Sequence, residues 1–159
     1  IKPICKAHGV PLIINDNVKL AKEIDADGVH LGQNDLDIKA AREYLGVDKI
    51  IGVSAHNVKE AQAAESGGAD YLGSGAAFVT STKTDAGAID HKVLSDVAHS
   101  VRIPVVAIGG ITSGNISRLE GLGLDGVAVV SAIFAAKDIP SAVNELKAKA
   151  ERVADSSVK

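Results

Sequence analysis

Six short apolar runs, each ending in a polar or glycine-rich corner, recur along this 159-residue chain. Most are continuous rather than alternating, which is typical of parallel strands covered on both faces. The segments between them space their apolar residues as helices do, as in Val18, Ala21 and Ile24. The predicted strands are Pro11–Asn15, Gly28–Gly32, Ile50–Ser54, Tyr71–Gly75, Pro104–Gly110 and Gly126–Ser131.

A local repeat marks three of the turns that lead from a helix into a strand. Asp27, Asp70 and Asp125 each stand immediately before a predicted strand. The same turn used three times indicates one repeated βα unit rather than two unrelated domains. We expect a single domain over residues 1–153, followed by a flexible tail, Ala154–Lys159.

The distribution of polar corners favours a barrel over an open doubly wound sheet. Polar residues follow all six predicted strands, and a barrel gathers all its strand ends around one mouth. A TIM (β/α)8-type barrel needs eight units, whereas six are visible here. The segment Ile1–Gly9 reads as the end of a helix. We therefore expect an N-terminally truncated barrel, with six parallel strands, alternating helices and two βα units absent in front.

Composition and charge exclude several functional classes. Hydrophobic residues make up 46% of the chain, but it has only two Phe, two Tyr and no Trp or Met, so aliphatic side chains must fill the core. The net charge is −3 and no basic cluster occurs, which argues against a nucleic-acid partner. No run approaches the length needed to span a bilayer, so we expect no membrane association and a cytoplasmic protein.

The last two strand ends indicate a phosphate site. Gly109 and Gly110 end one predicted strand, and Val130 and Ser131 end the next. Loops after the final two strands of a barrel commonly bind phosphate through backbone N–H groups, and glycine lets the backbone approach the oxygens. The alternative is that the two glycines only form a tight turn.

Two carboxylates on adjacent strand ends suggest a metal site. Asp16 and Asp35 follow the first and second predicted strands, and Mg²⁺ prefers a few carboxylates together with substrate phosphate oxygens. Asp35 has an equally good alternative, as the N-cap of a helix over Leu36–Leu45.

Other polar residues admit two interpretations. Thr80, Thr82 and Lys83 could bind anionic groups, although an isolated stretch of this kind is also typical of a surface loop. For His30 and His56, which lie near strand ends, a structural role is the favoured interpretation.

An ordered set of motifs runs from residue 11 to about residue 136. It comprises Ile13-Ile14-Asn15-Asp16, Ala26–Gln33 with Asp35, Ile51-Gly52-Val53-Ser54, Ala69–Gly73, Thr80-Ser81-Thr82-Lys83, Ala107–Ile111 and Gly126–Ile133. In this order the motifs resemble the thiamine phosphate synthase family. That resemblance implies a transferase of thiamine biosynthesis, which joins hydroxymethylpyrimidine diphosphate to hydroxyethylthiazole phosphate and releases pyrophosphate.

The resemblance also implies a role for each matching residue. It places Mg²⁺ on Asp16 and Asp35, and it gives Ser54 and Lys83 catalytic roles, Lys83 at the departing pyrophosphate. Substrate contacts are implied for Asn15, Ser54, Thr80, Thr82, Lys83, Gly110, Val130 and Ser131. Pyrophosphate departure precedes attack by the thiazole nitrogen in this chemistry, so no nucleophilic side chain is needed.

The chain departs from the family pattern in two places. The family's first two strands, with a Gln-x-Arg-x-Lys type segment, have no counterpart, and Ala76, Val79 and Ser81 replace prolines before and within the threonine loop. Two alternatives stay open: a thiazole tautomerase-like isomerase and a non-catalytic module that binds phosphate ligands. The sequence is also compatible with a homo-oligomer.

Overall fold

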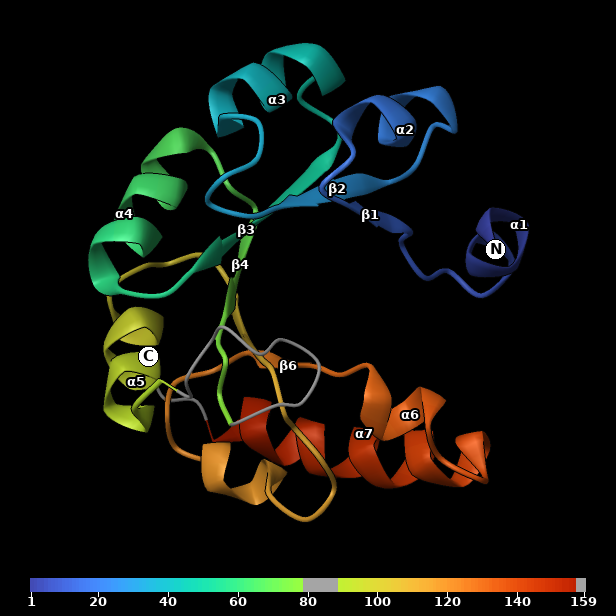
Figure 1. The fold of residues 1–159 in the computed structure, drawn as a ribbon, viewed down its shortest axis with the longest axis vertical. Helices are drawn as coiled ribbons and strands as arrows, with labels where there is room; N and C mark the ends of the chain where they lie inside the picture. The colour runs from blue at the N-terminus through green and yellow to red at the C-terminus, as the bar shows by residue number, and fades with distance from the viewer. Residues whose placement is uncertain (79–88, 157–159) are drawn as a thin grey trace.

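A single sheet of six parallel strands organises the computed structural model, which describes residues 1–78 and 89–156. The strands stand side by side in chain order, and each pairs in parallel with the next. Figure 1 shows the sheet curling into an open arc with helices on its convex side. The predicted six-stranded, TIM-type half-barrel is confirmed. Its strands are β1 (Ile13–Asn15), β2 (Gly28–Leu31), β3 (Ile50–Ala55), β4 (Tyr71–Ser74), β5 (Val105–Ile108) and β6 (Gly126–Ala128).

The helices follow the strands along the chain and cover the outer face of the arc (Figure 1). The exception is the first helix, which lies away from the sheet beside the opening of the arc. Between β5 and β6, where an alternating helix was expected, the chain forms only a short 3₁₀ turn. The helical elements are α1 (Lys2–Ala7), α2 (Val18–Glu23), α3 (Ile38–Leu45), α4 (Val58–Gly67), α5 (His91–His99), η1 (Ile116–Leu119), α6 (Ser131–Phe134) and α7 (Ile139–Asp155).

The hydrophobic core lies between the sheet and the helices. Along each strand, side chains point alternately to the helices and to the inner side of the arc. Leu31, Ile51 and Leu72 point outward and are fully buried, whereas His30 and Tyr71 point inward and are half-buried. The prediction that both faces of the strands are covered is therefore wrong for the inner face in the described ranges, because the arc is open.

The three repeated aspartates have one structural role. Each accepts a hydrogen bond, through its side chain, from a backbone N–H at the start of the preceding strand, and its own N–H donates to the carbonyl of that same residue. The donors to Asp27, Asp70 and Asp125 are Leu12 (2.7 Å), Ile51 (2.7 Å) and Val105 (2.8 Å). These pairs of hydrogen bonds fix the amino ends of neighbouring strands. They lie at the edge of the sheet opposite the carboxyl ends of the strands, where the predicted site residues are.

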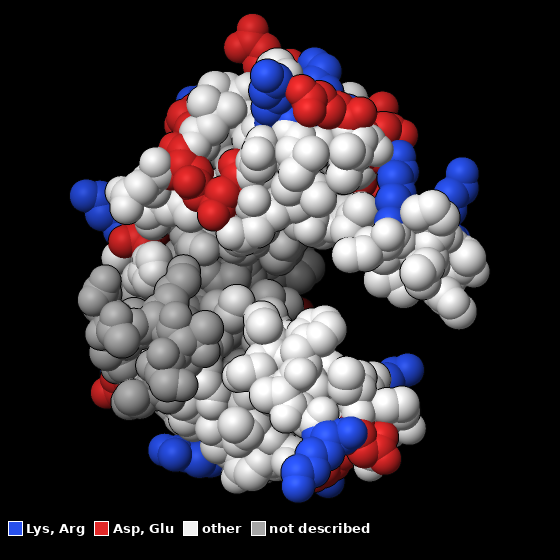
Figure 2. Space-filling view, turned by 45° about the vertical axis from the view of Figure 1, so that its right-hand side comes forward, with Lys and Arg blue, Asp and Glu red and all other residues white. Residues whose placement is uncertain are grey.

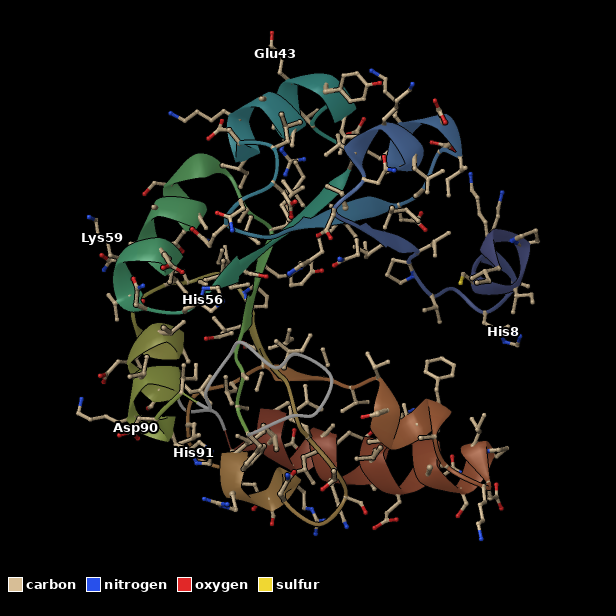
Figure 3. All side chains as sticks on the ribbon, viewed as in Figure 1. His8, Glu43, His56, Lys59, Asp90 and His91 are labelled. Carbon is tan, nitrogen blue, oxygen red and sulfur yellow. The ribbon has the colours of Figure 1, made fainter. Side chains whose placement is uncertain are left out.

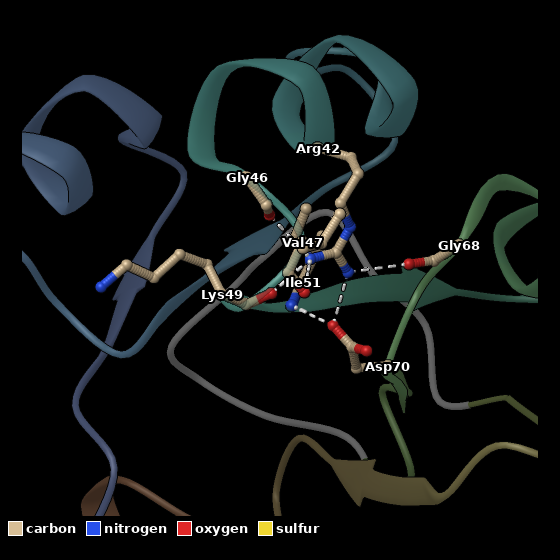
Figure 4. Close-up of polar contacts among 7 residues, drawn as sticks. All are labelled: Arg42, Gly46, Val47, Lys49, Ile51, Gly68 and Asp70. Atoms are coloured by element: carbon tan, nitrogen blue, oxygen red, sulfur yellow. Dashed lines mark hydrogen bonds and ion pairs between the residues drawn. The ribbon is translucent and has the colours of Figure 1, made fainter.

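Arg42 of α3 strengthens one of these links (Figure 4). Its Nη2 donates to the Asp70 carboxylate at 2.7 Å and to one backbone carbonyl, while its Nη1 donates to three more. The guanidinium thus joins the end of α3, the start of β3 and the end of α4 at one point. The accepting carbonyls are those of Gly46, Val47, Lys49 and Gly68.

Capping side chains set the helix boundaries, and they correct one prediction. Asp37 caps α3, accepting from Lys39 N at 3.0 Å, so Asp35 is not an N-cap and the helix begins at Ile38 rather than Leu36. Asn57 caps α4 and Asp138 caps α7, each through its side chain. At the other end, α7 continues through Asp155, and residues 157–159 of the expected tail lie outside the described ranges.

The open side of the arc is a hollow, and the described side chains seen on its walls in Figure 2 are mainly uncharged. Most of the Lys, Arg, Asp and Glu side chains in this view lie further out on the surface. Both β1 and β6 are edge strands of the sheet, as expected for an arc that does not close. Large apolar side chains are exposed near the two ends of the arc, among them Ile4 (64%) and Phe134 (76%).

Among the described residues, no helix is long and apolar enough to cross a membrane.

Ser74 of β4 provides a test of the core. Its hydroxyl is fully buried and has no hydrogen-bond partner in the described structure. Because an unsatisfied buried hydroxyl is costly, we expect Ser74→Ala to raise the free energy of unfolding by about 1 kcal/mol. Ser100→Ala is the control: Ser100 Oγ donates to Val97 O at 2.8 Å, so its removal should lower stability. Urea denaturation measures both, and destabilisation by Ser74→Ala would contradict the packing described.

Candidate active site

A pocket of about 270 Å³ lies at the carboxyl ends of the strands, on the inner side of the arc. Every strand contributes to it, either directly or through the loop that follows. Five residues predicted to bind substrate meet here from four strand ends: Asn15, Ser54, Gly110, Val130 and Ser131. Their proximity is thus observed, while their roles stay predictions. Their neighbours in the lining are His30, His56, Gly73, Gly75, Ala76, Ile108, Gly109, Ile111, Ala128 and Val129.

Glycine is favoured at the two positions after β5, 109 and 110, for structural reasons that differ in part. Gly109 has a φ of 99°, and a side chain there would place its Cβ 2.8 Å from Ala76 Cα, so backbone packing alone requires glycine. Gly110 also has a positive φ, of 64°, and lines the pocket. Both glycines therefore belong to the turn and to the pocket wall, and the close approach of Ala76 is an additional reason for glycine at position 109.

Hydrogen bonds fix the orientation of the peptide groups around these glycines. The carbonyls of Ile108 and Gly109 accept from Ala77 and Phe78 at 2.9 and 3.0 Å. Asn115 Nδ2 donates to the Gly110 carbonyl at 2.9 Å. The carbonyl groups of this loop thus accept hydrogen bonds from within the protein.

The N–H groups along this wall are available to a ligand. In residues 1–78 and 89–156, no acceptor is found for the backbone N–H groups of Gly110, Val130 and Ser131. N–H donors from two adjacent strand ends lining one pocket are an arrangement suited to an anion.

His30, a residue for which a structural role was favoured, lines the pocket and contacts two side chains. Its Nε2 lies 3.0 Å from Ser54 Oγ, and its Nδ1 lies 3.0 Å from the Tyr71 hydroxyl. Burial lowers the pKa of the His30 imidazole below its usual value, an effect that the charges of Asp16 and Asp35 oppose. Burial also raises the pKa of the Tyr71 phenol. Both groups are therefore neutral near pH 7.

His56 lies at the carboxyl end of β3, where α4 begins (Figure 3). Its ring Nδ1 is 2.9 Å from Glu60 Oε2, and its backbone N–H donates to that same oxygen at 2.8 Å. By contrast, Glu43 and Lys59 project outward from the helices, away from the strands (Figure 3). His56 thus lines the pocket, and its contacts with Glu60 hold it at the start of α4.

The predicted metal ligands flank the pocket rather than line it. Asp16 directly follows β1 with a φ of 63°, a left-handed conformation that Asp and Asn tolerate better than most residues. Asp35 accepts from Gly32 N at 2.6 Å and borders a second hollow, of about 200 Å³, between the β2–α3 loop and α4. Both carboxylates are near enough to His30 to influence its pKa. Thr80, Thr82 and Lys83 lie outside the described residues.

The fold and the pocket together define the class of protein. A TIM-type arc of parallel strands, with its pocket at their carboxyl ends, is the architecture of barrel proteins that act on small molecules in the loops after the strands. 3-Hexulose-6-phosphate synthase, a solved structure 20% identical to this chain, shares this fold with a TM-score of 0.68 over 94% of the chain and 78% of its own length.

Comparison with known proteins identifies the family. A family model described as thiamine monophosphate synthase matches residues 1–133, so the chain belongs to that family. The thiamine-phosphate synthase of Methanobrevibacter smithii is 51% identical over 94% of this chain and 73% of its own length. That of Geobacillus kaustophilus is 51% identical over 97% of the chain and 70% of its own length. Thiamine phosphate pyrophosphorylase from Pyrococcus furiosus superposes with a TM-score of 0.86, at 40% identity over 96% of this chain and 73% of its own length.

Proposed function

We propose that the chain is a transferase that joins hydroxymethylpyrimidine diphosphate to hydroxyethylthiazole phosphate, giving thiamine phosphate and pyrophosphate. The observation that carries this proposal is the convergence of Asn15, Ser54, Gly110, Val130 and Ser131 on one pocket. Family membership supplies the reaction, and the pocket supplies a place where two small substrates can meet.

The chain's own residues bind and orient the substrates. The N–H groups of Gly110, Val130 and Ser131 hold the thiazole phosphate, assisted by the hydroxyls of Thr80 and Thr82. Asn15 and Ser54 hold the pyrimidine from the opposite wall, while Lys83 places a positive charge at the departing pyrophosphate. Orienting two substrates within one pocket can supply a large part of the rate enhancement, so a nucleophilic side chain is not required.

Asp16 and Asp35 fit a divalent cation. Magnesium is usually bound by one or two carboxylates, with phosphate oxygens of the substrate and water completing the set. The described residues contain no group of three or more His, Cys, Asp or Glu side chains that could hold a metal by themselves. A pair of carboxylates beside a diphosphate is a donor set suited to Mg²⁺, which when bound would neutralise charge on the leaving pyrophosphate.

A product assay tests the proposal. The purified protein is incubated with both substrates and Mg²⁺, and thiamine phosphate and pyrophosphate are quantified. We expect the two products in equal amounts, with none when either substrate or Mg²⁺ is omitted. Conversion of the thiazole substrate to an isomer alone would indicate a tautomerase instead. Substrate binding without any product would indicate a non-catalytic binding module.

A further inference from the structure

Three side chains from three adjacent strands form a continuous chain of hydrogen bonds that ends at the pocket. The Tyr71 hydroxyl lies 3.0 Å from His30 Nδ1, and His30 Nε2 lies 3.0 Å from Ser54 Oγ. Ser54 and His30 line the pocket, whereas Tyr71 is not among the residues that line it. Substrate contact explains the presence of Ser54 but leaves Tyr71 without a role.

The strand register shows that the sequence makes room for this chain of side chains. His30 pairs with Gly52, which pairs in turn with Tyr71, so the two rings meet above a glycine. A Cβ on Gly52 would come within 2.5 Å of His30 Nδ1. Ser54 likewise pairs with Gly73, where a Cβ would lie 3.0 Å from His30 Cε1. Side chains at positions 52 and 73 would therefore displace the imidazole.

The chemistry of the three groups sets the direction of the hydrogen bonds. A neutral imidazole has one N–H donor and one acceptor nitrogen. A phenol, with a pKa of about 10, is more acidic than an alkyl hydroxyl and is the better donor. Tyr71 is therefore the donor to His30 Nδ1, which places the imidazole proton on Nε2. That N–H in turn donates to Ser54 Oγ.

We propose that Tyr71 and His30 are positioning residues that hold the Ser54 hydroxyl as an acceptor from the imidazole, so that its own proton is directed to the bound substrate. The proposal rests on the proposed function for the identity of that substrate, the pyrimidine diphosphate. With the tautomer reversed, Ser54 would donate to His30 and could offer a ligand only lone pairs.

Nitrogen-15 NMR of the imidazole tests the tautomer without relying on turnover. In protein with labelled histidine, His30 is assigned by its loss in His30→Gln. We expect a protonated Nε2 and an unprotonated Nδ1 near pH 7, and a shift toward the other tautomer in Tyr71→Phe. Protonation at Nδ1 in the unsubstituted protein would overturn the proposal, whether or not the protein makes thiamine phosphate.

A double-mutant cycle tests the link from Tyr71 to Ser54. We expect Tyr71→Phe to lower kcat about five- to tenfold, with KM for the thiazole phosphate unchanged. In a Ser54→Ala background the same change should have almost no further effect, because the hydroxyl it positions is gone. Tyr44→Phe, at the other tyrosine, on the exposed face of α3, is the matched control and should leave kcat unchanged. An equal loss from Tyr71→Phe in both backgrounds would overturn the proposal.

Discussion

Replacing Asp16 with Asn is expected to reduce turnover on the order of a thousandfold, because it removes a carboxylate that the proposed Mg²⁺–diphosphate complex requires. Asn is preferred to Ala for this test, since Asp16 has a φ of 63°, which Asn adopts readily. The loss is then due to charge rather than to backbone strain. Added Mg²⁺ should restore turnover only poorly. The measurement is kcat for thiamine phosphate formation over a range of Mg²⁺ concentrations.

Asp35→Asn should have a comparable effect if Asp35 also binds the metal. Its carboxylate accepts from Gly32 N, an interaction that an amide oxygen can retain, so the loop should stay folded. The matched control is Asp37→Asn, two residues further along the same loop. Asp37 is the N-cap of α3, a position where Asn is as favourable as Asp, so neither turnover nor stability should change much. Wild-type turnover in both Asp16→Asn and Asp35→Asn would contradict the metal assignment.

Arg42→Ala is expected to lower the free energy of unfolding by about 2 kcal/mol. The guanidinium joins four backbone carbonyls and Asp70, and its removal breaks all of these hydrogen bonds at once, including the part-buried one to the Lys49 carbonyl. Arg42→Lys should recover only part of the loss, because an ammonium group cannot span the same acceptors. Because Arg42 lies at the amino ends of the strands, kcat of the folded protein should be unchanged. Chemical denaturation and turnover are the two measurements.

Arg102→Ala provides the control for the Arg42 substitution. Arg102 is exposed, and its backbone N–H, rather than its side chain, makes the contact with Glu65. Its removal should change stability by less than about 0.5 kcal/mol. Equal losses from the Arg42 and Arg102 substitutions would show that the guanidinium of Arg42 does not link α3, β3 and α4.

The sheet was predictable because each strand combines an apolar run with a recognisable entry or exit. Asp27, Asp70 and Asp125 mark the entry to a strand, and the structure shows why: each carboxylate binds the start of the neighbouring strand. Strand ends were less predictable. The strand expected to run to Gly110 ends at Ile108, because Gly109 and Gly110 both adopt positive φ.

The composition of the pocket was only partly predictable. Asn15, Ser54, Gly110 and Ser131 could be recognised as polar or glycine positions just after apolar runs. His30 and Tyr71 could not be linked in this way, since their contact depends on the register of three strands. A polar residue between two buried aliphatic residues, as in Val29-His30-Leu31, was the available signal that the histidine faces the pocket.

The start of α3 shows a different limit of sequence reasoning. Asp35 and Asp37 are both good N-cap residues two positions apart, and local preference alone does not choose between them. The β2–α3 loop decides, because Asp35 is held by the Gly32 N–H and only Asp37 reaches the first turn of the helix.

A crystal structure of the protein with thiamine phosphate bound would show which groups hold the phosphate. We expect the phosphate to lie between the loop after β5 and the loop after β6, with its oxygens about 3 Å from the backbone nitrogens of Gly110 and Ser131. The pyrimidine should lie toward Asn15 and Ser54 on the opposite wall. A phosphate bound outside this pocket, or a pocket that stays empty at saturating thiamine phosphate, would contradict the account.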